Sequence, residues 1–151
     1  MAKICKDCNR DLDLNEFAAD GRKTCKGCEL FLVTKNNERG RGKPLELTRQ
    51  EMLEAFGKSA SRRCYYCGIS ETAYVQLRVV TPSGKPGLRL GIDRTDSSAA
   101  YKTGNVVVCC LVCNRIKSSL FSHEEMKELG RTINLVWQAR GIDAVLPPGA
   151  P

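Results

Sequence analysis

Residues 64–117 decide the fold, and they read CYYCGISETAYVQLRVVTPSGKPGLRLGIDRTDSSAAYKTGNVVVCCLVCNRIK. A Cys-x-x-Cys pair opens this stretch at Cys64 and Cys67, and a second pair lies near its end at Cys110 and Cys113. Because thiolates at this spacing bind zinc tetrahedrally, the four sulfurs can meet at one ion. The metal then folds the intervening segment back on itself, so the residues between the two pairs are presented together.

The segment between the two pairs predicts a strand, a long loop and a second strand, with a helix to follow. Residues 88–92 alternate between apolar side chains and others, the period of two that is typical of a half-buried strand. This period places Asp93 on the face opposite the apolar residues. A second strand is expected over 106–108, and a helix is expected to begin at Asn114.

Four short motifs follow one another in this region: Cys-x-x-Cys, Ile-Asp-Arg-x-Asp, Gly-Asn-Val-Val and Cys-x-x-Cys-Asn-x-x-Lys. In this order the chain resembles the HNH endonucleases, and the resemblance covers residues 47–140. The linked motifs are far more specific than any one of them alone. The resemblance implies a small, zinc-stabilised α+β fold with a ββα-metal (HNH) core, flanked by helices and preceded by a zinc ribbon.

The resemblance also implies roles for individual residues. By position, Asp93 matches the metal-binding acid of the family, Asn105 the asparagine that braces the loop, and Asn114 a second metal ligand. Carboxylate and amide oxygens suit a hard divalent cation, so the expected catalytic metal is Mg²⁺ or Mn²⁺. Asp96, which follows in the same motif, is a further carboxylate for metal or water.

One position departs from the commoner pattern of the family. Many members have a general-base histidine directly after the acid, where this chain has Arg94, as in a variant subgroup with Asp-Arg-x-Asp. An arginine cannot accept a proton at physiological pH, but its planar guanidinium suits a phosphate clamp. His123 is the only histidine of the chain. It follows the expected helix cap Ser122, where a solvent-facing position is the simpler interpretation and a displaced general base is the alternative.

A second group of cysteines lies in the N-terminal segment, at Cys5, Cys8, Cys25 and Cys28. This spacing is typical of a small zinc ribbon, whose few apolar residues cannot fold it without metal. Such a ribbon can contact nucleic acid through its lysines and arginines, or it can serve as a structural cap or docking module. Together the two groups predict two structural zinc ions.

The nine cysteines also allow a disulfide scaffold. Their odd number, their arrangement in Cys-x-x-Cys pairs and the lack of an export signal favour zinc instead. Cys109 is the spare cysteine. Because neighbouring residues of a strand point to opposite faces, Cys109 and Cys110 are not expected to bind the same ion.

The chain divides into a zinc ribbon over 1–36, a basic linker over 37–47, an HNH-type domain over 48–140 and a disordered tail over 141–151. A short helix is expected over 29–37, and extended pieces over 74–80 and 88–92 on either side of a turn. Capping boxes at Thr48 and Ser122 begin two more helices. The second of these has an apolar face that is expected to pack under the ββα unit.

The net charge of +7 resides mainly in residues 48–117, which hold 11 basic and 5 acidic side chains. Each four-thiolate zinc site carries a formal charge of about −2, so the charge alone is weak support for nucleic acid. The expected nucleic-acid contacts are Arg94, Lys102, Arg115 and Lys117, and DNA is the favoured partner. No stretch has the length of a membrane span, so a cytoplasmic location without membrane contact is expected.

These observations leave three functions open. The first is a metal-dependent HNH endonuclease that hydrolyses or nicks DNA. The second is a catalytically weak HNH fold that acts as a nucleic-acid-binding module, which the missing histidine keeps open. The third is a zinc-stapled adaptor for protein interactions, which would lack salt-dependent DNA binding.

Overall fold

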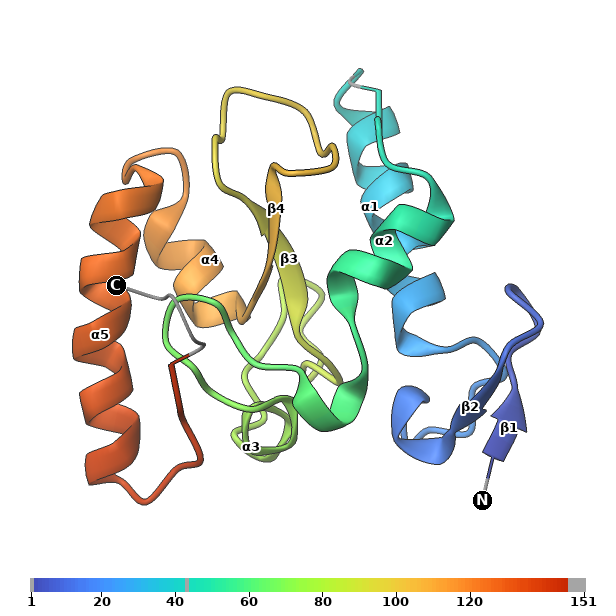
Figure 1. The fold of residues 1–151 in the computed structure, drawn as a ribbon, viewed down its shortest axis with the longest axis horizontal. Coiled ribbons are helices and arrows are strands. Elements are labelled where there is room, and N and C mark those ends of the chain that lie inside the picture. Colours follow the sequence, from blue (N-terminus) through green and yellow to red (C-terminus); the bar gives the residue numbers. More distant parts are fainter. Residues whose placement is uncertain (1, 43, 147–151) are drawn as a thin grey trace.

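The structure is a computed structural model, and it describes residues 2–42 and 44–146 (Figure 1). Within these residues the chain has the small α+β fold that the sequence predicts. In chain order the elements are β1 (Ala2–Ile4), β2 (Asp11–Asp13), the 3₁₀ turn η1 (Leu14–Glu16), α1 (Lys26–Gly40), α2 (Arg49–Phe56), the 3₁₀ turn η2 (Ser59–Ser61), α3 (Glu71–Gln76), β3 (Gly91–Arg94), β4 (Val106–Cys109), α4 (Leu111–Lys117) and α5 (His123–Ala139).

The centre of the molecule is a β-hairpin followed by a helix. Strands β3 and β4 pair antiparallel, with Ile92 opposite Val108 and Asp93 opposite Val107. Helix α4 begins directly after β4, because the thiol of Cys110 caps it by accepting a hydrogen bond from the backbone N–H of Cys113 at 3.4 Å. This arrangement is the predicted ββα unit, and the predicted strand over 106–108 is confirmed. The helix was expected to begin at Asn114, but the cap at Cys110 begins it three residues earlier, at Leu111.

Two predicted strands differ in the structure. The segment 74–80 was expected to be extended, but its first residues belong to helix α3. Ser70 caps this helix by accepting a hydrogen bond from Ala73 N at 3.2 Å. The strand expected over 88–92 begins later, at Gly91. The backbone N–H of Leu90 is directed instead to the Glu71 carboxylate, at 3.1 Å.

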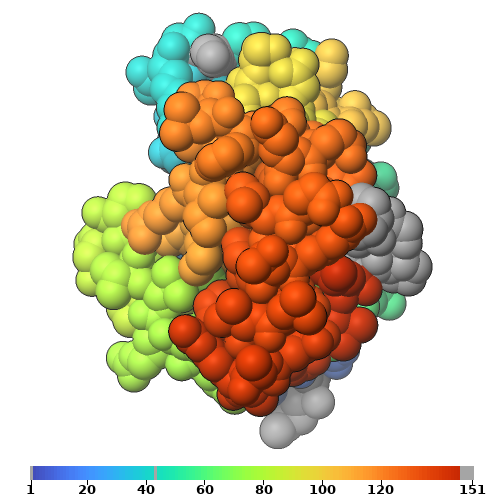
Figure 2. Space-filling view, turned by 90° about the vertical axis from the view of Figure 1, so that its left-hand side faces the viewer, coloured from blue at the N-terminus to red at the C-terminus, as the bar shows by residue number. Residues whose placement is uncertain are grey.

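Helix α5 covers one face of the ββα unit and packs along α4, as predicted (Figure 2). Gly130 makes the close approach possible. A Cβ atom at this position would lie 2.7 Å from the carbonyl carbon of Tyr66, which is nearer than packed atoms come. Phe56, Tyr66 and Met126 are buried at the centre of the core that results.

Helix α1 links the ribbon to this core. It begins directly after Cys25 and continues to Gly40, so it is longer at both ends than the predicted helix and includes the first residues of the segment expected to be a linker. Phe31, Thr34 and Glu38 are buried on one side of it, the spacing of a single helical face. The helix lies against α2 and runs from the ribbon towards the loop between β3 and β4 (Figure 1).

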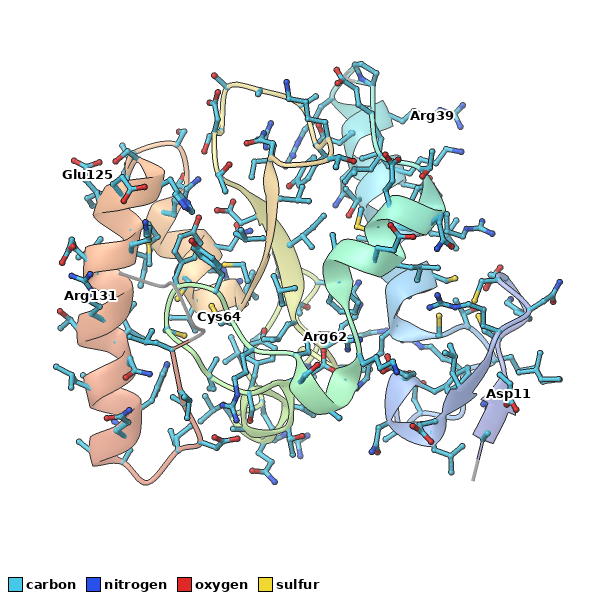
Figure 3. The ribbon with its side chains drawn as sticks, viewed as in Figure 1. Asp11, Arg39, Arg62, Cys64, Glu125 and Arg131 are labelled. Carbon is cyan, nitrogen blue, oxygen red and sulfur yellow. The ribbon has the colours of Figure 1, made fainter. Side chains whose placement is uncertain are left out.

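A buried ionic cluster joins the ribbon to the core at the start of α1. The carboxylate of Glu71 accepts two hydrogen bonds from Arg62 Nη1, at 2.7 and 2.8 Å, and one from Lys26 Nζ at 2.7 Å. Arg62 also contacts Glu16 of η1 at 2.8 Å, and Figure 3 shows Arg62 between the core and the ribbon. The contacts tie three segments together with charges that are shielded from water.

Part of the expected tail packs against the body of the molecule. Ala144 is buried and forms a β-bridge with Ile69. Its carbonyl oxygen accepts a hydrogen bond from Asn134 at 3.2 Å. Residues 141–146 therefore differ from the disordered segment expected there, because their backbone fills a place beside the Cys-x-x-Cys loop. Residues 147–151 of that segment lie outside the described residues.

Candidate functional site

Two groups of four cysteines have the geometry of zinc sites. Their sulfurs lie within 4.8 Å of one another in each group, and the members are Cys5, Cys8, Cys25 and Cys28 in the first and Cys64, Cys67, Cys110 and Cys113 in the second. Tetrahedral zinc with Zn–S bonds of 2.3 Å separates its sulfurs by about 3.8 Å, and Cys67 and Cys110 are 3.8 Å apart. Each group can therefore hold one zinc ion. Cys109 belongs to neither group and donates to the carbonyl oxygen of Cys110.

Asp93 lies on β3 and is 8% exposed. Its Oδ2 atom accepts a hydrogen bond from the Tyr66 hydroxyl at 3.0 Å and contacts Lys117 Nζ at 3.2 Å. Lys117 is fully buried, and its ammonium also donates to the carbonyl oxygen of Arg94 at 2.8 Å. The structure thus places Lys117 inside the molecule, where its charge offsets that of Asp93, and not on the surface where a phosphate contact was expected.

Asn114 lies on α4, across from β3. Its Nδ2 atom donates to the carbonyl oxygen of Ile92 at 3.3 Å, so the amide oxygen is not used in this contact. Asn114, Asp93 and Arg94 line one cavity of 340 Å³. A carboxylate and an amide oxygen beside one cavity are the hard ligands that Mg²⁺ and Mn²⁺ prefer, so the residues present fit such a cation.

Arg94 lies at the edge of the same cavity. Its Nη1 atom donates to the carbonyl oxygen of Ala99 at 3.0 Å, and its guanidinium carbon is 5.0 Å from the centre of the Tyr101 ring. These contacts fix the plane of the guanidinium and leave other N–H groups for a ligand. Lys102 and Arg115, two other expected contacts to nucleic acid, are exposed.

Asn105 and Asp96 shape the loop between the strands. The Asn105 amide accepts from Thr95 Oγ1 at 2.7 Å and from Asp96 N at 2.8 Å, and it donates to the carbonyl oxygens of Asp96 and Ala100. The Asp96 carboxylate accepts from the backbone and hydroxyl of Ser98, at 2.9 and 2.6 Å. The structure therefore brings Asp93, Arg94 and Asn114 together, while Asp96 is exposed and is not among the residues that line their cavity.

A contact that the sequence did not indicate links His123 to this site. His123 Nδ1 lies 3.2 Å from the Tyr66 hydroxyl, and its ring stacks on Tyr65 with centroids 5.4 Å apart. Burial lowers the pKa of His123, while burial and the charge of Asp93 raise the pKa of Tyr66. The sequence held one hint of this contact, which is the pair Tyr65 and Tyr66 between Cys64 and Cys67. Tyr66 contacts both Asp93 and His123.

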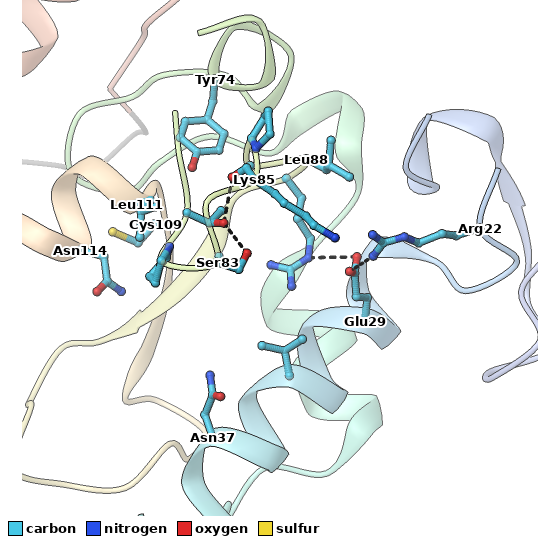
Figure 4. A pocket seen from close by; sticks show the side chains of 17 residues that line it. Arg22, Glu29, Asn37, Tyr74, Ser83, Lys85, Leu88, Cys109, Leu111 and Asn114 are labelled. Carbon is cyan, nitrogen blue, oxygen red and sulfur yellow. Dashed lines mark hydrogen bonds and ion pairs between the residues drawn. The ribbon is translucent and has the colours of Figure 1, made fainter. Parts of the chain in front are cut away.

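A second cavity, of 490 Å³, lies on the other side of Asn114 (Figure 4). Basic residues line part of it, among them Arg22 and Lys85. Figure 4 shows Arg22 paired with Glu29 of α1 at the end remote from Asn114. Basic side chains from the ribbon and the core thus line the second cavity, which shares Asn114 with the first.

None of the helices among the described residues is both long and apolar enough to cross a membrane.

Comparison with known proteins identifies one family. No protein-family model matches the chain, and no curated protein matches it. A solved structure does match: PacI, a rare-cutting HNH restriction endonuclease that perturbs DNA, is 40% identical to this chain. The match covers 93% of this chain and 99% of PacI, with a TM-score of 0.89. The chain therefore belongs to the HNH endonuclease family.

Proposed function

We propose that the protein is a metal-dependent DNA endonuclease that hydrolyses phosphodiester bonds at the cavity beside Asp93 and Asn114. The observation that carries the proposal is the meeting of a buried carboxylate, an amide oxygen and a fixed guanidinium around one cavity in the ββα unit. A divalent cation held by Asp93 and Asn114 would polarise the scissile phosphate and stabilise the leaving oxygen. Either Mg²⁺ or Mn²⁺ suits these ligands.

The surrounding residues of the chain orient the metal ligands. Tyr66 and Lys117 both contact Asp93 at Oδ2, so they fix the carboxylate and leave Oδ1 available for the cation. Asn114 is held through its amide nitrogen, which leaves its oxygen available as well. Preorganised ligands of this kind lose little entropy when the cation and substrate bind.

Arg94 supplies a phosphate clamp in this proposal. The guanidinium is already held by Ala99 and Tyr101, so its free N–H groups can bond two phosphate oxygens and stabilise the charge that develops on them. Exposed Lys102 and Arg115 extend this positive surface along the DNA backbone. Lys85 adds a further cation beside the second cavity.

Plasmid cleavage tests the proposal. Supercoiled DNA is incubated with the protein in Mg²⁺, in Mn²⁺ and with a chelator, and nicked and linear products are followed in time. We expect metal-dependent cleavage that Asp93→Ala and Asn114→Ala both remove, because each loses a metal ligand. Arg94→Ala should lower the rate by roughly 10²–10³-fold, the scale for losing one preorganised charge partner.

The zinc content of each variant is the control, since none of the three residues is a cysteine ligand. A wild-type protein that binds DNA but cuts it in neither metal would favour the binding module instead. In that case Arg94→His, which restores the residue common in the family, becomes the informative variant. Absence of salt-dependent DNA binding would favour the adaptor.

A further inference from the structure

Arg41 is a second arginine beside the metal-ligand candidates. It caps the C-terminal end of α1 and lines the 340 Å³ cavity together with Asp93, Arg94 and Asn114. Helix α1 brings it there from the ribbon side, whereas the other three residues belong to the ββα unit. Among the described residues that line this cavity, Arg41 and Arg94 are the two cations.

A buried carboxylate holds the charged end of Arg41 at this cavity. The Nη1 atom of Arg41 donates to Glu38 Oε1 at 2.9 Å, and the Glu38 side chain is 2% exposed. Glu38 lines the same cavity. Because a buried carboxylate is costly without a cation beside it, the pair ties the guanidinium of Arg41 to a residue of the cavity wall.

Tyr101, which also lines the cavity, lies near both guanidinium groups. Burial raises the pKa of Tyr101, and the positive charges of Arg94 and Arg41 oppose this rise. The guanidinium carbon of Arg94 is 5.0 Å from the centre of the Tyr101 ring. Successive phosphates of one DNA strand are only about 3.4 Å apart along the helix axis. A strand bound by Arg94 therefore presents further phosphates to a second cation on the same cavity.

Stabilisation of the helix does not account for this arrangement. An i,i+3 ion pair supports a helix when both side chains lie at the surface, and exposed pairs contribute little. Here the carboxylate of Glu38 is buried, whereas the side chain of Arg41 is 61% exposed. Among the described residues the guanidinium makes only its hydrogen bond to Glu38. An arginine has five N–H donors, so the pair orients a cation that keeps donors for a ligand.

Resting on the proposed nuclease function, we infer that Arg41 binds a DNA backbone phosphate next to the scissile one. Arg94 follows Asp93 directly in β3 and is less exposed than Arg41, so Arg94 takes the scissile phosphate. The charge of the neighbouring phosphate does not change during the reaction. Its contact with Arg41 is equally strong in the bound substrate and in the transition state, so it increases affinity and leaves kcat unchanged.

The salt dependence of DNA binding tests this contact. The ligand is a labelled duplex with a cleavage site mapped on the plasmid, and Kd is measured by fluorescence anisotropy without added Mg²⁺ or Mn²⁺. Arg41→Ala should raise Kd by roughly 10-fold, the scale of one charge-assisted hydrogen bond. It should also reduce the slope of log affinity against log salt concentration by about 1. Arg41→Lys keeps the charge and should keep the slope, but it loses the planar fork and should recover only part of the affinity.

Arg39→Ala is the matched control. Arg39 is exposed on the same helix and is not among the residues that line the cavity, and Figure 3 shows it directed away from β3 and β4. This variant should keep the wild-type Kd and slope. An equal loss in Arg39→Ala would mean that the effect comes from general surface charge, and it would overturn the inference.

A double variant separates the contact from the stability of the fold. Arg41→Ala leaves Glu38 buried without its cation, which should lower the midpoint of thermal unfolding. Glu38→Gln in the same chain removes the unpaired charge, so the double variant should unfold closer to the wild type and still show the reduced slope. A wild-type slope in the double variant would trace the loss to the fold and would overturn the contact.

Cleavage kinetics separate Arg41 from the clamp at Arg94. Arg41→Ala should raise KM and leave kcat unchanged, whereas Arg94→Ala should lower kcat. A lower kcat with unchanged Kd in Arg41→Ala would place Arg41 on the scissile phosphate and overturn the assignment to its neighbour.

The failure of this inference can be distinguished from that of the proposed function. If the wild type cuts and Asp93→Ala does not, while Arg41→Ala binds and cuts like the wild type, the nuclease stands and the inference is wrong. If the wild type cuts in neither metal, the proposed function is wrong. A reduced slope of Arg41→Ala on plasmid DNA would then still support the phosphate contact, and an unchanged slope would overturn it as well.

Discussion

The two four-cysteine clusters lie in very different surroundings. Around the first cluster the buried core consists of three of its own cysteines, Phe17 and Leu53, and Leu53 belongs to α2. Around the second cluster, aromatic and aliphatic residues from α1, α2, α3, β3 and α5 form a much larger core. A metal in the first cluster therefore replaces a hydrophobic core, whereas a metal in the second adds to one.

The largest expected effect comes from removing a cysteine of each cluster. Cys8→Ser should lower the zinc content from two ions to one and should expose the backbone amides of the ribbon to hydrogen exchange, while those of β3, β4 and α5 keep their protection. The reason is that structural zinc supplies about 10–16 kcal/mol, which the small ribbon core cannot replace. Mass-spectrometric hydrogen exchange and elemental analysis measure both quantities.

Cys67→Ser is the matched change in the second cluster. It should weaken protection throughout the chain, because α1 and α2 pack on the core that this cluster supports. Unfolding of the whole chain in one step by Cys8→Ser would contradict the independence of the core from the first cluster. An unchanged core in Cys67→Ser would contradict the contribution of the second cluster to it.

The sequence predicted the local parts of both regions correctly. The clusters, the ββα order and the two capping boxes depend on residues close together in the chain, and each has the expected form. The segment at 74–80 was mispredicted because its tyrosine and valines favour strands. In the structure the cap at Ser70 and the anchoring of Glu71 begin a helix there instead.

What the sequence could not predict is the set of contacts between distant segments. Lys117 was expected at the surface, but Arg94 and Asp93 hold it inside. Glu38 lay in a segment predicted as a linker, and only the full length of α1 brings it to the cavity. Periodicity describes which face of an element is apolar, and it does not say which polar residues another element will enclose.

The next effect concerns the ionic cluster that joins the two regions. Glu71→Ala leaves Arg62 and Lys26 buried without their shared partner, which should cost about 3–5 kcal/mol. Urea unfolding gives the change in free energy. Glu124→Ala, which breaks an exposed pair with Lys127, is the control and should leave the midpoint almost unchanged. A small effect of Glu71→Ala would mean that the two regions are not joined through this cluster.

A smaller loss of stability is expected from a change at Gly130, in helix α5 of the core. Gly130→Ala places a methyl group against the backbone of Tyr66, and overpacking of this kind costs about 1–3 kcal/mol. Because Tyr66 contacts Asp93, the cleavage rate should decrease too. Gly40→Ala, at the end of α1, meets no atom within 4 Å and should not destabilise the chain. Equal stability of both variants by calorimetry would contradict the close packing of α5.

The smallest expected effect is a pH dependence of the folding stability, which arises from His123 on the core side of the molecule. Burial lowers the pKa of His123 below the value of about 6.5 that it has in the unfolded chain. The unfolded chain then binds more protons between the two pKa values, so stability is complete above about pH 6.5 and decreases as the pH falls below it. His123→Gln should flatten this part of the stability curve. A curve that is identical in the variant would show that another group is responsible.

Helix α1 gives the small N-terminal region an influence on the cavity at the other end of the helix. At 1.5 Å per residue its 15 residues span about 22 Å, from the first cysteine cluster to the cavity that holds Glu38. A helix fixes the orientation of its far end as well as its distance, because each added residue rotates everything beyond it by about 100°. One alanine inserted between Cys28 and Glu38 would leave both cysteine clusters intact and rotate the carboxylate away from the cavity. The orientation of the ribbon relative to the cavity therefore depends on the number of residues in α1. A ribbon from another protein could replace it only if it kept the same helical register.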